Sequence, residues 1–295
     1  MQRDYLPAVP ESCGMCSERL QRISAMLEGM VADEKLPFAR LKIAKAGKLV
    51  YDETFNGRLG TITEQSYYRY YSQTKIIATV ATLLAVERGL LRLDDPCEMY
   101  IPQFANAQRY VSGTAEGGDI KTEDAASPPT IRQCLMHTAG LAYGGLFAGN
   151  GIVDEVDRIY IANNLGVQEL IHEGGLATMF GSLESIAARI GEMPLRHHPG
   201  HLWDYANGHI VAVRCAEVAM QRKATEFVQT EIFTPLGMTT AGWGVSKDHP
   251  DLLPMYEYAT VTMTPGKPWS LKQSDLIPAA QLGKAKYCLL RALPL

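Results

Sequence analysis

Residues 71–96 read YSQTKIIATVATLLAVERGLLRLDDP, and this stretch decides which fold the chain can adopt. From Ile76 to Arg88 the apolar side chains recur every three or four residues, which predicts one long helix with an apolar face. Gly89 follows as the residue that most easily adopts the left-handed backbone conformation that ends a helix. Ser72 and Lys75 stand at the start of this helix, where residues three apart share one face.

The Ser72–Lys75 pair has the chemistry of an activated nucleophile. A serine hydroxyl is a weak nucleophile until a base takes its proton, and a lysine amine can take it when burial keeps the amine neutral. The free N–H groups at a helix start would also stabilise an oxyanion. If only the four residues Ser72–Lys75 are considered, the alternative is a plain helix start with an exposed lysine. The aromatic-rich run before it and the apolar helix after it favour an active site, so we predict Ser72 as nucleophile and Lys75 as base.

Tyr205-Ala206-Asn207 is the second element that carries chemistry. A tyrosine near the Ser-Lys pair could carry the proton between the nucleophile and the leaving group. The amide of Asn207 could contact a substrate carbonyl, and Trp203 could form a wall of the pocket. The alternative is a buried tyrosine, a turn-forming asparagine at a helix entry and a tryptophan that packs in the core.

Other segments show periodicity or turn residues that outline the fold. Residues 17–32 predict a helix, and residues 38–44 and 49–51 predict two strands joined by a turn at Gly47. Two strands alone do not make a stable sheet, so we expect the tail to complete it. Residues 106–129 are polar and predict a surface insertion. Further helices are expected at residues 131–137, 167–171, 183–190, 208–220 and 225–233.

Four motifs occur along the chain in a fixed order. They are Ser72–Lys75 with the exit Glu87–Pro96, then Thr130–Leu141, then Trp203 with Tyr205–Asn207, and finally Pro235–Thr239. In this order they resemble the motifs of the serine β-lactamase-related family, which includes class C β-lactamases, family VIII carboxylesterases and penicillin-binding proteins. The resemblance implies an α+β fold of the β-lactamase/transpeptidase type. In this α/β sandwich, an antiparallel sheet flanked by helices lies beside an all-helical lobe.

The resemblance also implies a domain organisation. We expect an N-terminal arm at residues 1–16 and one β-lactamase-related domain at residues 17–295. Within that domain, residues 17–70 would form the N-terminal part of the sheet lobe. Residues 71–240 would form a mainly helical lobe with the active site, and residues 241–295 an atypical tail.

By the same resemblance, Ser72 is the acylated nucleophile, Lys75 the base and Tyr205 the proton shuttle, while Asn207 contacts the substrate. Trp203, as a wall of the pocket, is the second expected substrate-binding residue. The implied protein is a serine hydrolase that acts through an acyl-enzyme, as a carboxylesterase on small esters. β-Lactamase, D-aminopeptidase and transacylase activities are alternatives, because one fold hosts all of these chemistries. The expected partner is a small-molecule ester or amide, and neither a metal nor an organic cofactor is implied.

The chain departs from the family pattern in its last part. The family carries a later strand with K-T-G or H-x-G, which lends a backbone N–H to the oxyanion hole. No K-[ST]-G occurs here, and His198-Pro199-Gly200 precedes Tyr205 and belongs to a turn. We therefore expect a truncated C-terminus with incomplete strands and low or absent activity, since losing one oxyanion donor typically costs ~10²–10³ in rate. A catalytically impaired truncated isoform or a binding scaffold is the alternative.

The composition argues against several other classes of protein. The chain has 295 residues, 46% hydrophobic and 20% charged, with a formal net charge of -4, which is ordinary for a globular protein. This charge gives no reason to expect nucleic acid or an anionic membrane as partner. No apolar leader follows Met1 and no apolar stretch is long enough to span a bilayer, so we expect a cytoplasmic protein. The oligomeric state does not follow from the sequence.

The cysteines and histidines do not predict a metal site. Cys13 and Cys16 form a lone C-x-x-C pair, which we interpret as two thiols in the N-terminal arm. The other cysteines are scattered and predict core thiols; they are Cys97, Cys134, Cys215 and Cys288. A Pro-Gly turn interrupts the ligand spacing of the clustered histidines, which are His197, His198 and His201. His137 is interpreted as a residue that packs against or caps a helix.

Overall fold

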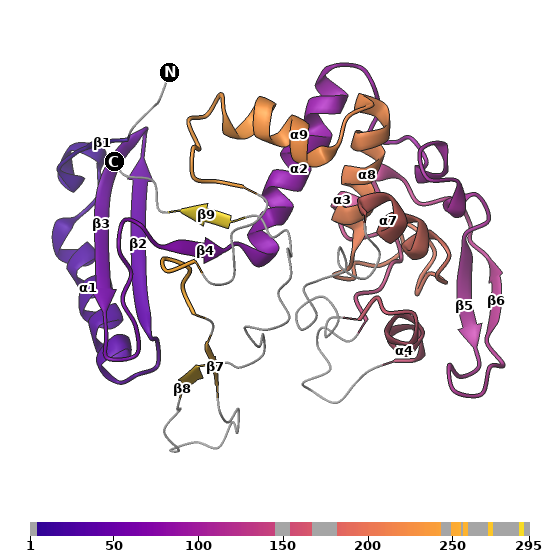
Figure 1. The fold of residues 1–295 in the computed structure, drawn as a ribbon, viewed down its shortest axis with the longest axis horizontal. Helices are drawn as coiled ribbons and strands as arrows, with labels where there is room; N and C mark the ends of the chain where they lie inside the picture. Colours follow the sequence, from indigo (N-terminus) through magenta and orange to yellow (C-terminus); the bar gives the residue numbers. More distant parts are fainter. Residues whose placement is uncertain are drawn as a thin grey trace.

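The computed structural model describes residues 5–144, 154–166, 182–242 and 249–254, and the short strands 256–258, 271–273 and 289–291. Two groups of elements lie on either side of helix α2 (Thr74–Glu87), as Figure 1 shows. One group is a sheet with helix α1 (Ser17–Ala32), and the other is a set of helices around α8 (Gly208–Met220). This α+β arrangement confirms the predicted fold class. The helix expected at residues 167–171 lies outside the described residues.

The sheet forms around the hairpin that the sequence predicted. Strands β2 (Phe38–Lys45) and β3 (Lys48–Asn56) pair antiparallel, with Phe38 opposite Asn56. Ala46 and Gly47 connect them with φ values of 51° and 73°. Two consecutive residues with positive φ give a tight turn whose twist matches that of the strands. The turn pairs Lys45 with Lys48, and a bulge between Ile43 and Ala44 then shifts the register of the rest of the hairpin by one residue.

Strand β3 joins the sheet to α1 and to the N-terminal segment. Leu49, Val50, Tyr51 and Phe55 of β3 are buried. The Tyr51 hydroxyl lies 3.0 Å from the hydroxyl of Ser24 on α1. Strand β1 (Leu6–Pro7) pairs parallel with β3. The segment expected as an arm thus contributes the third strand of the sheet.

The described strands of the tail do not extend this sheet. Strand β7 (Tyr256–Tyr258) pairs with β8 (Leu271–Gln273), and β9 (Leu289–Arg291) pairs antiparallel with β4 (Tyr67–Arg69). The expectation that the tail completes the N-terminal sheet is therefore wrong for these three strands. Pairing of β9 with β4 instead places part of the tail beside the segment that leads into residue 72 (Figure 1).

The helical group is built on α8, which packs against α2 and carries small side chains on its buried face. Three short helices surround this pair; they are α3 (Ile131–Leu135), α7 (Leu183–Gly191) and α9 (Ala224–Val228). A π-helical turn at residues 229–233 continues α9. Among the described helices, none is long and apolar enough to cross a membrane.

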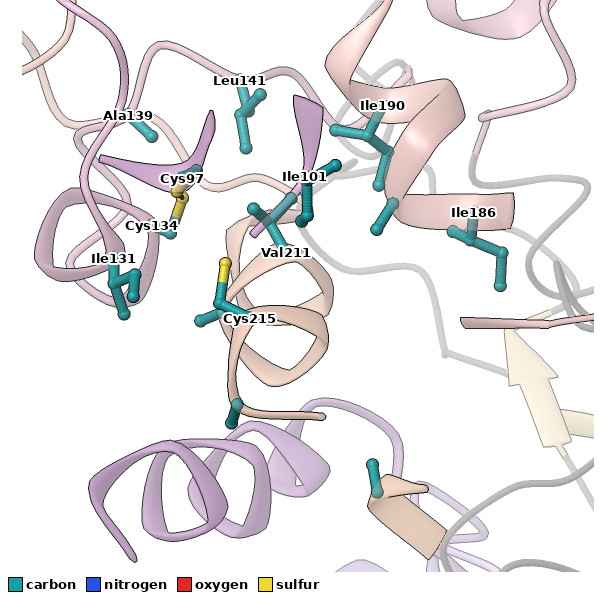
Figure 2. Packing of buried hydrophobic residues seen from close by; sticks show 14 of the residues in the cluster. Cys97, Ile101, Ile131, Cys134, Ala139, Leu141, Ile186, Ile190, Val211 and Cys215 are labelled. Carbon is teal, nitrogen blue, oxygen red and sulfur yellow. Dashed lines mark hydrogen bonds between the residues drawn. The ribbon is translucent and has the colours of Figure 1, made fainter. Parts of the chain in front are cut away.

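Three cysteines meet in the core of this group. Cys97, Cys134 and Cys215 are each fully buried, at 0% exposure, as predicted for core thiols. The sulfur atoms of Cys97 and Cys134 lie 3.7 Å apart, which is a contact between free thiols. Figure 2 shows the three side chains between Ile131 and Val211. Cys288 lies outside the described residues.

The polar segment expected as an insertion folds into a two-stranded hairpin at the edge of the helical group. Strands β5 (Gln108–Ser112) and β6 (Lys121–Asp124) pair antiparallel. Arg109 and Glu123 face each other across the hairpin, with Nη2 and Oε1 2.6 Å apart. Helix α4 (Glu155–Ala162), which was not predicted from the sequence, lies on the same side of the molecule (Figure 1).

Gly208 at the start of α8 should not tolerate a side chain. A Cβ atom built at this position would lie 2.2 Å from the carbonyl oxygen of Cys134, which is backbone and cannot move aside. We expect Gly208→Ala to lower the free energy of unfolding by about 1–3 kcal/mol, as overpacking in a core typically does. Urea denaturation followed by circular dichroism measures this change.

Gly29 in α1 provides the matched control for that substitution. A Cβ atom there would meet nothing within 4 Å. Gly29→Ala should stabilise the protein by about 0.5–1 kcal/mol, because alanine loses less backbone entropy in a helix. Equal stabilities of the two variants would contradict the close approach of α8 to α3.

Candidate active site

Ser72 lies in a short 3₁₀ turn, Tyr71–Gln73, that leads directly into α2. Ser72 is exposed, whereas Ile77 and Ala81 on the inner face of α2 are buried. Tyr71 has a φ of 41°. Such a left-handed conformation is strained for a bulky side chain, and strained residues are enriched at functional sites. The turn thus presents the Ser72 hydroxyl at the N-terminal end of α2.

The Ser72 hydroxyl is hydrogen-bonded to Tyr205. The oxygen atoms of the two side chains are 2.6 Å apart, although the residues are 133 positions apart in the sequence. This distance is typical of a strong O–H···O bond. The structure therefore brings the predicted nucleophile and the predicted proton shuttle into direct contact.

Lys75 lies over the rings of two tyrosines. Its Nζ atom is 4.5 Å from the centroid of the Tyr205 ring and 5.5 Å from that of Tyr143. An ammonium group at these distances is attracted by the ring faces. Among the described residues, the Ser72 hydroxyl is bonded to Tyr205 and not to Lys75. The Lys75 cation is thus placed to stabilise negative charge on the Tyr205 phenol, and its role as the base stays a prediction.

Asn207 and Trp203 occupy different environments. Asn207 is 3% exposed, and its Nδ2 donates a hydrogen bond to the Ala142 carbonyl at 3.4 Å. Trp203 is 66% exposed, and its ring centroid lies 6.5 Å from that of Tyr205. The contact of either residue with a substrate stays a prediction. Of the two, Trp203 has the accessible surface that such a contact requires.

A largely buried arginine fixes the segment that carries Trp203 and Tyr205. Arg196 bonds to Asp204 on this segment, and its Nη2 lies 2.8 Å from Oδ1 of Asp157 on α4. Its Nε lies 2.7 Å from Oδ2 of Asp154. Burial by itself lowers the pKa of Arg196, but the three carboxylates raise it well above its ordinary value. The charged arginine therefore ties the active-site segment to the start of α4.

Three aromatic residues of the site were not predicted from the sequence. Tyr143 packs against Tyr205 at 5.2 Å between ring centroids, and burial raises its pKa to about 12. His137 stacks on Tyr205 at 4.6 Å, and the His209 ring lies 4.9 Å from His137. Only the position of His137 inside the Thr130–Leu141 motif could have pointed to it. No pattern in the sequence marks the other two.

The clustered histidines of the H-H-P-G-H segment point to different partners. His198 accepts a hydrogen bond from the Ala126 amide at Nδ1, and its Nε2 lies 3.3 Å from Glu123. His197 faces Asp204 instead, at 3.8 Å from Nε2. Pro199 and Gly200 follow both of these residues and precede His201, whose ring centroid lies 5.4 Å from that of His198. Their proximity in the sequence thus reflects two separate contacts of one turn.

His209 should make the stability of the protein depend on pH. Burial, with further contributions from His137 and Lys75, lowers its pKa from 6.5 to about 4. The unfolded chain then binds this proton more tightly than the folded chain, so stability is complete above pH 6.5 and falls as the pH drops toward 4. Between pH 7 and pH 4.5 this group alone should remove about 2–3 kcal/mol from the free energy of unfolding.

Urea denaturation of the wild type and His209→Phe at both pH values tests this prediction. The variant cannot take up the proton, so its stability should fall less than that of the wild type over this interval. Carboxylates held at low pKa by arginines, such as Glu231, titrate in both proteins and cancel in the comparison. Parallel losses in the two proteins would contradict the assignment to His209.

Comparison with protein families gives one match over most of the chain, to Beta-lactamase at residues 23–280. "Esterase EstB" from Burkholderia gladioli is 26% identical over 75% of this chain and 51% of its own length. "Acyltransferase mokF" from Monascus pilosus is 24% identical over 80% of this chain and 54% of its own length. The chain thus spans about half the length of these curated relatives.

Among solved structures, "Simvastatin Synthase (LovD)" from Aspergillus terreus superposes with a TM-score of 0.70 at 20% identity. The match covers 94% of this chain and 66% of that protein. A likeness at this identity concerns the fold, and it confirms the predicted β-lactamase/transpeptidase-like architecture.

Proposed function

Because the chain belongs to the β-lactamase family, we propose that it is a serine hydrolase that reacts through an acyl-Ser72 intermediate. One observation carries the proposal. A hydroxyl at the start of α2 is hydrogen-bonded at 2.6 Å to a tyrosine whose ring lies 4.5 Å from a lysine ammonium. A serine needs such a neighbour to lose its proton during attack.

In the proposed reaction Tyr205 takes the role of base that the sequence predicted for Lys75. The Ser72 oxygen attacks the carbonyl carbon of an ester while its proton passes to Tyr205, which reacts as the phenolate. The positive charge of Lys75 next to the ring stabilises that phenolate before the attack. Tyr205 then gives the proton to the departing alkoxide, which leaves as the alcohol. Water attacks the acyl-Ser72 ester in the second half, so that a carboxylic acid is released and Ser72 recovers its proton.

A carboxylic ester is the substrate class that the relatives favour. One curated relative is named an esterase. In this chain, Trp203 offers an exposed apolar surface beside Tyr205 for the acyl or alcohol group of an ester. A second candidate is acyl transfer to an alcohol, because another relative of similar identity is named an acyltransferase. The two activities share the acyl-Ser72 intermediate and differ only in the acceptor.

Reaction with a fluorophosphonate probe tests the proposal before the substrate is known. The purified protein should gain the mass of one phosphonyl group in intact-mass spectrometry. Turnover of p-nitrophenyl butanoate with and without added butanol would then separate hydrolysis from transfer. A folded protein that gains no adduct would contradict the proposal and favour a non-catalytic binding role.

A further inference from the structure

His137 adopts a left-handed backbone conformation, which costs free energy for residues other than glycine. It follows the C-terminal end of α3 with a φ of 60°, a conformation that glycine or asparagine adopts with less strain. In this conformation its carbonyl oxygen accepts a hydrogen bond from the Asp204 amide at 2.8 Å. A histidine at such a position needs a compensating contact of its side chain.

The side chain of His137 makes that contact on the other side of Tyr205. Its Nδ1 atom accepts a hydrogen bond from the Ala206 amide at 3.1 Å. The two residues that flank Tyr205 are therefore both bonded to His137. The imidazole also stacks on the Tyr205 ring, with 4.6 Å between centroids and 25° between planes. Three contacts of one residue thus hold the backbone and the ring of Tyr205.

We propose that His137 is a positioning residue that, in its neutral form, holds the Tyr205 phenol against Ser72. The proposal rests on the proposed hydrolase function, in which Tyr205 carries the proton. Because Nδ1 accepts a hydrogen bond, the proton of the neutral ring is on Nε2. A second proton at Nδ1 would turn that acceptor into a donor facing the Ala206 amide and would release the segment.

The groups around His137 keep it neutral. Lys75 on α2, His209 on α8 and Asp204 on the segment before α8 face this ring together with Tyr205. Burial and the Lys75 charge lower the pKa of His137, and Asp204 opposes them in part. Protonation therefore requires a pH below the ordinary range of histidine, which is near 6.5.

Two substitutions separate the contacts of His137. His137→Asn suits the left-handed backbone but removes the stacked ring, whereas His137→Phe keeps a ring and removes the acceptor. We expect each to slow labelling of Ser72 by the fluorophosphonate probe by about 10- to 100-fold at pH 7.5, the size of effect that a small misplacement of a catalytic group produces. Labelling of the wild type should slow as the pH falls below 6.5. This decrease in rate, the acid limb of the pH profile, should be smaller in both variants.

His201→Asn is the matched control, because His201 is exposed and contacts the ring of His198. It should label like the wild type at every pH. Thermal melting of all variants at pH 7.5 identifies any that do not fold, and one folded His137 variant is sufficient for the test. Wild-type labelling rates and an unchanged acid limb in a folded His137 variant would overturn the proposal.

Nuclear magnetic resonance of ¹⁵N-histidine protein distinguishes failure of this proposal from failure of the hydrolase function. The signal that disappears in His137→Asn belongs to His137, and it should show a proton on Nε2 at pH 7.5 and a lowered pKa. This readout needs no activity. A proton on Nδ1 would overturn the positioning role of His137, whatever the activity. If the spectrum is as expected but the protein gains no fluorophosphonate adduct, only the hydrolase function is rejected.

Discussion

Ser72→Ala will reduce the rate of ester hydrolysis by at least ~10³-fold and abolish the fluorophosphonate adduct, because no other group in the proposed mechanism can form the acyl intermediate. Ser72 is exposed, and its hydroxyl is hydrogen-bonded to Tyr205. The variant should therefore fold normally, with a melting temperature close to that of the wild type. Intact-mass spectrometry and a chromogenic ester assay measure the two losses.

Ser112→Ala is the control for that substitution. Ser112 is also exposed, but it lies on strand β5 in the peripheral hairpin. Its removal should leave both the adduct and the rate unchanged. If Ser72→Ala kept its adduct, the labelled nucleophile would be another residue, and the proposed acyl-Ser72 intermediate would be wrong.

Lys75→Met should have the second largest effect, a loss of about 10²–10⁴-fold in the labelling rate, as expected for a residue that supports proton transfer. Methionine keeps an unbranched apolar chain of similar length and removes the ammonium group that lies 4.5 Å from the Tyr205 ring. Without this charge nothing offsets the negative charge that the proposed mechanism places on Tyr205. The labelling rate of the variant should therefore stay low at every pH at which the protein is folded.

Lys48→Met provides the comparison for Lys75, since Lys48 is exposed at the start of β3. It should label at the wild-type rate. A Lys75→Met protein that labels within a factor of three of the wild type would show that neither proton removal nor charge stabilisation depends on this lysine.

Local patterns predicted the elements of this fold well, and long-range pairings poorly. The periodicity of residues 17–32 and 208–220 gave α1 and α8 with their observed bounds, because each helix has one apolar face set by its own residues. The pairing of β1 with β3, and of β9 with β4, depends on segments that are distant in the sequence. A short strand such as Leu6–Pro7 has no periodicity of its own from which a partner could be inferred.

The same distinction applies to the site. Ser72, Lys75 and Tyr205 lie in recognisable motifs, and the structure places these three side chains next to one another. The roles assigned to them remain predictions. His137, Tyr143 and His209 complete the aromatic surroundings through tertiary packing. Their contribution could not be inferred from spacing, because it arises where the end of α3, the loop after it and the start of α8 meet.

The 133-residue separation between Ser72 and Tyr205 has a consequence for folding. Closing a loop of that length costs about 4 kcal/mol of chain entropy, so this contact forms only when the intervening helices have already packed. Reactivity of Ser72 should then appear late in refolding, after most helical signal has returned. A protease cut in the segment between the two residues would leave both sequence motifs intact, but only the packing of α2 against α8 would then hold the nucleophile beside its proton carrier.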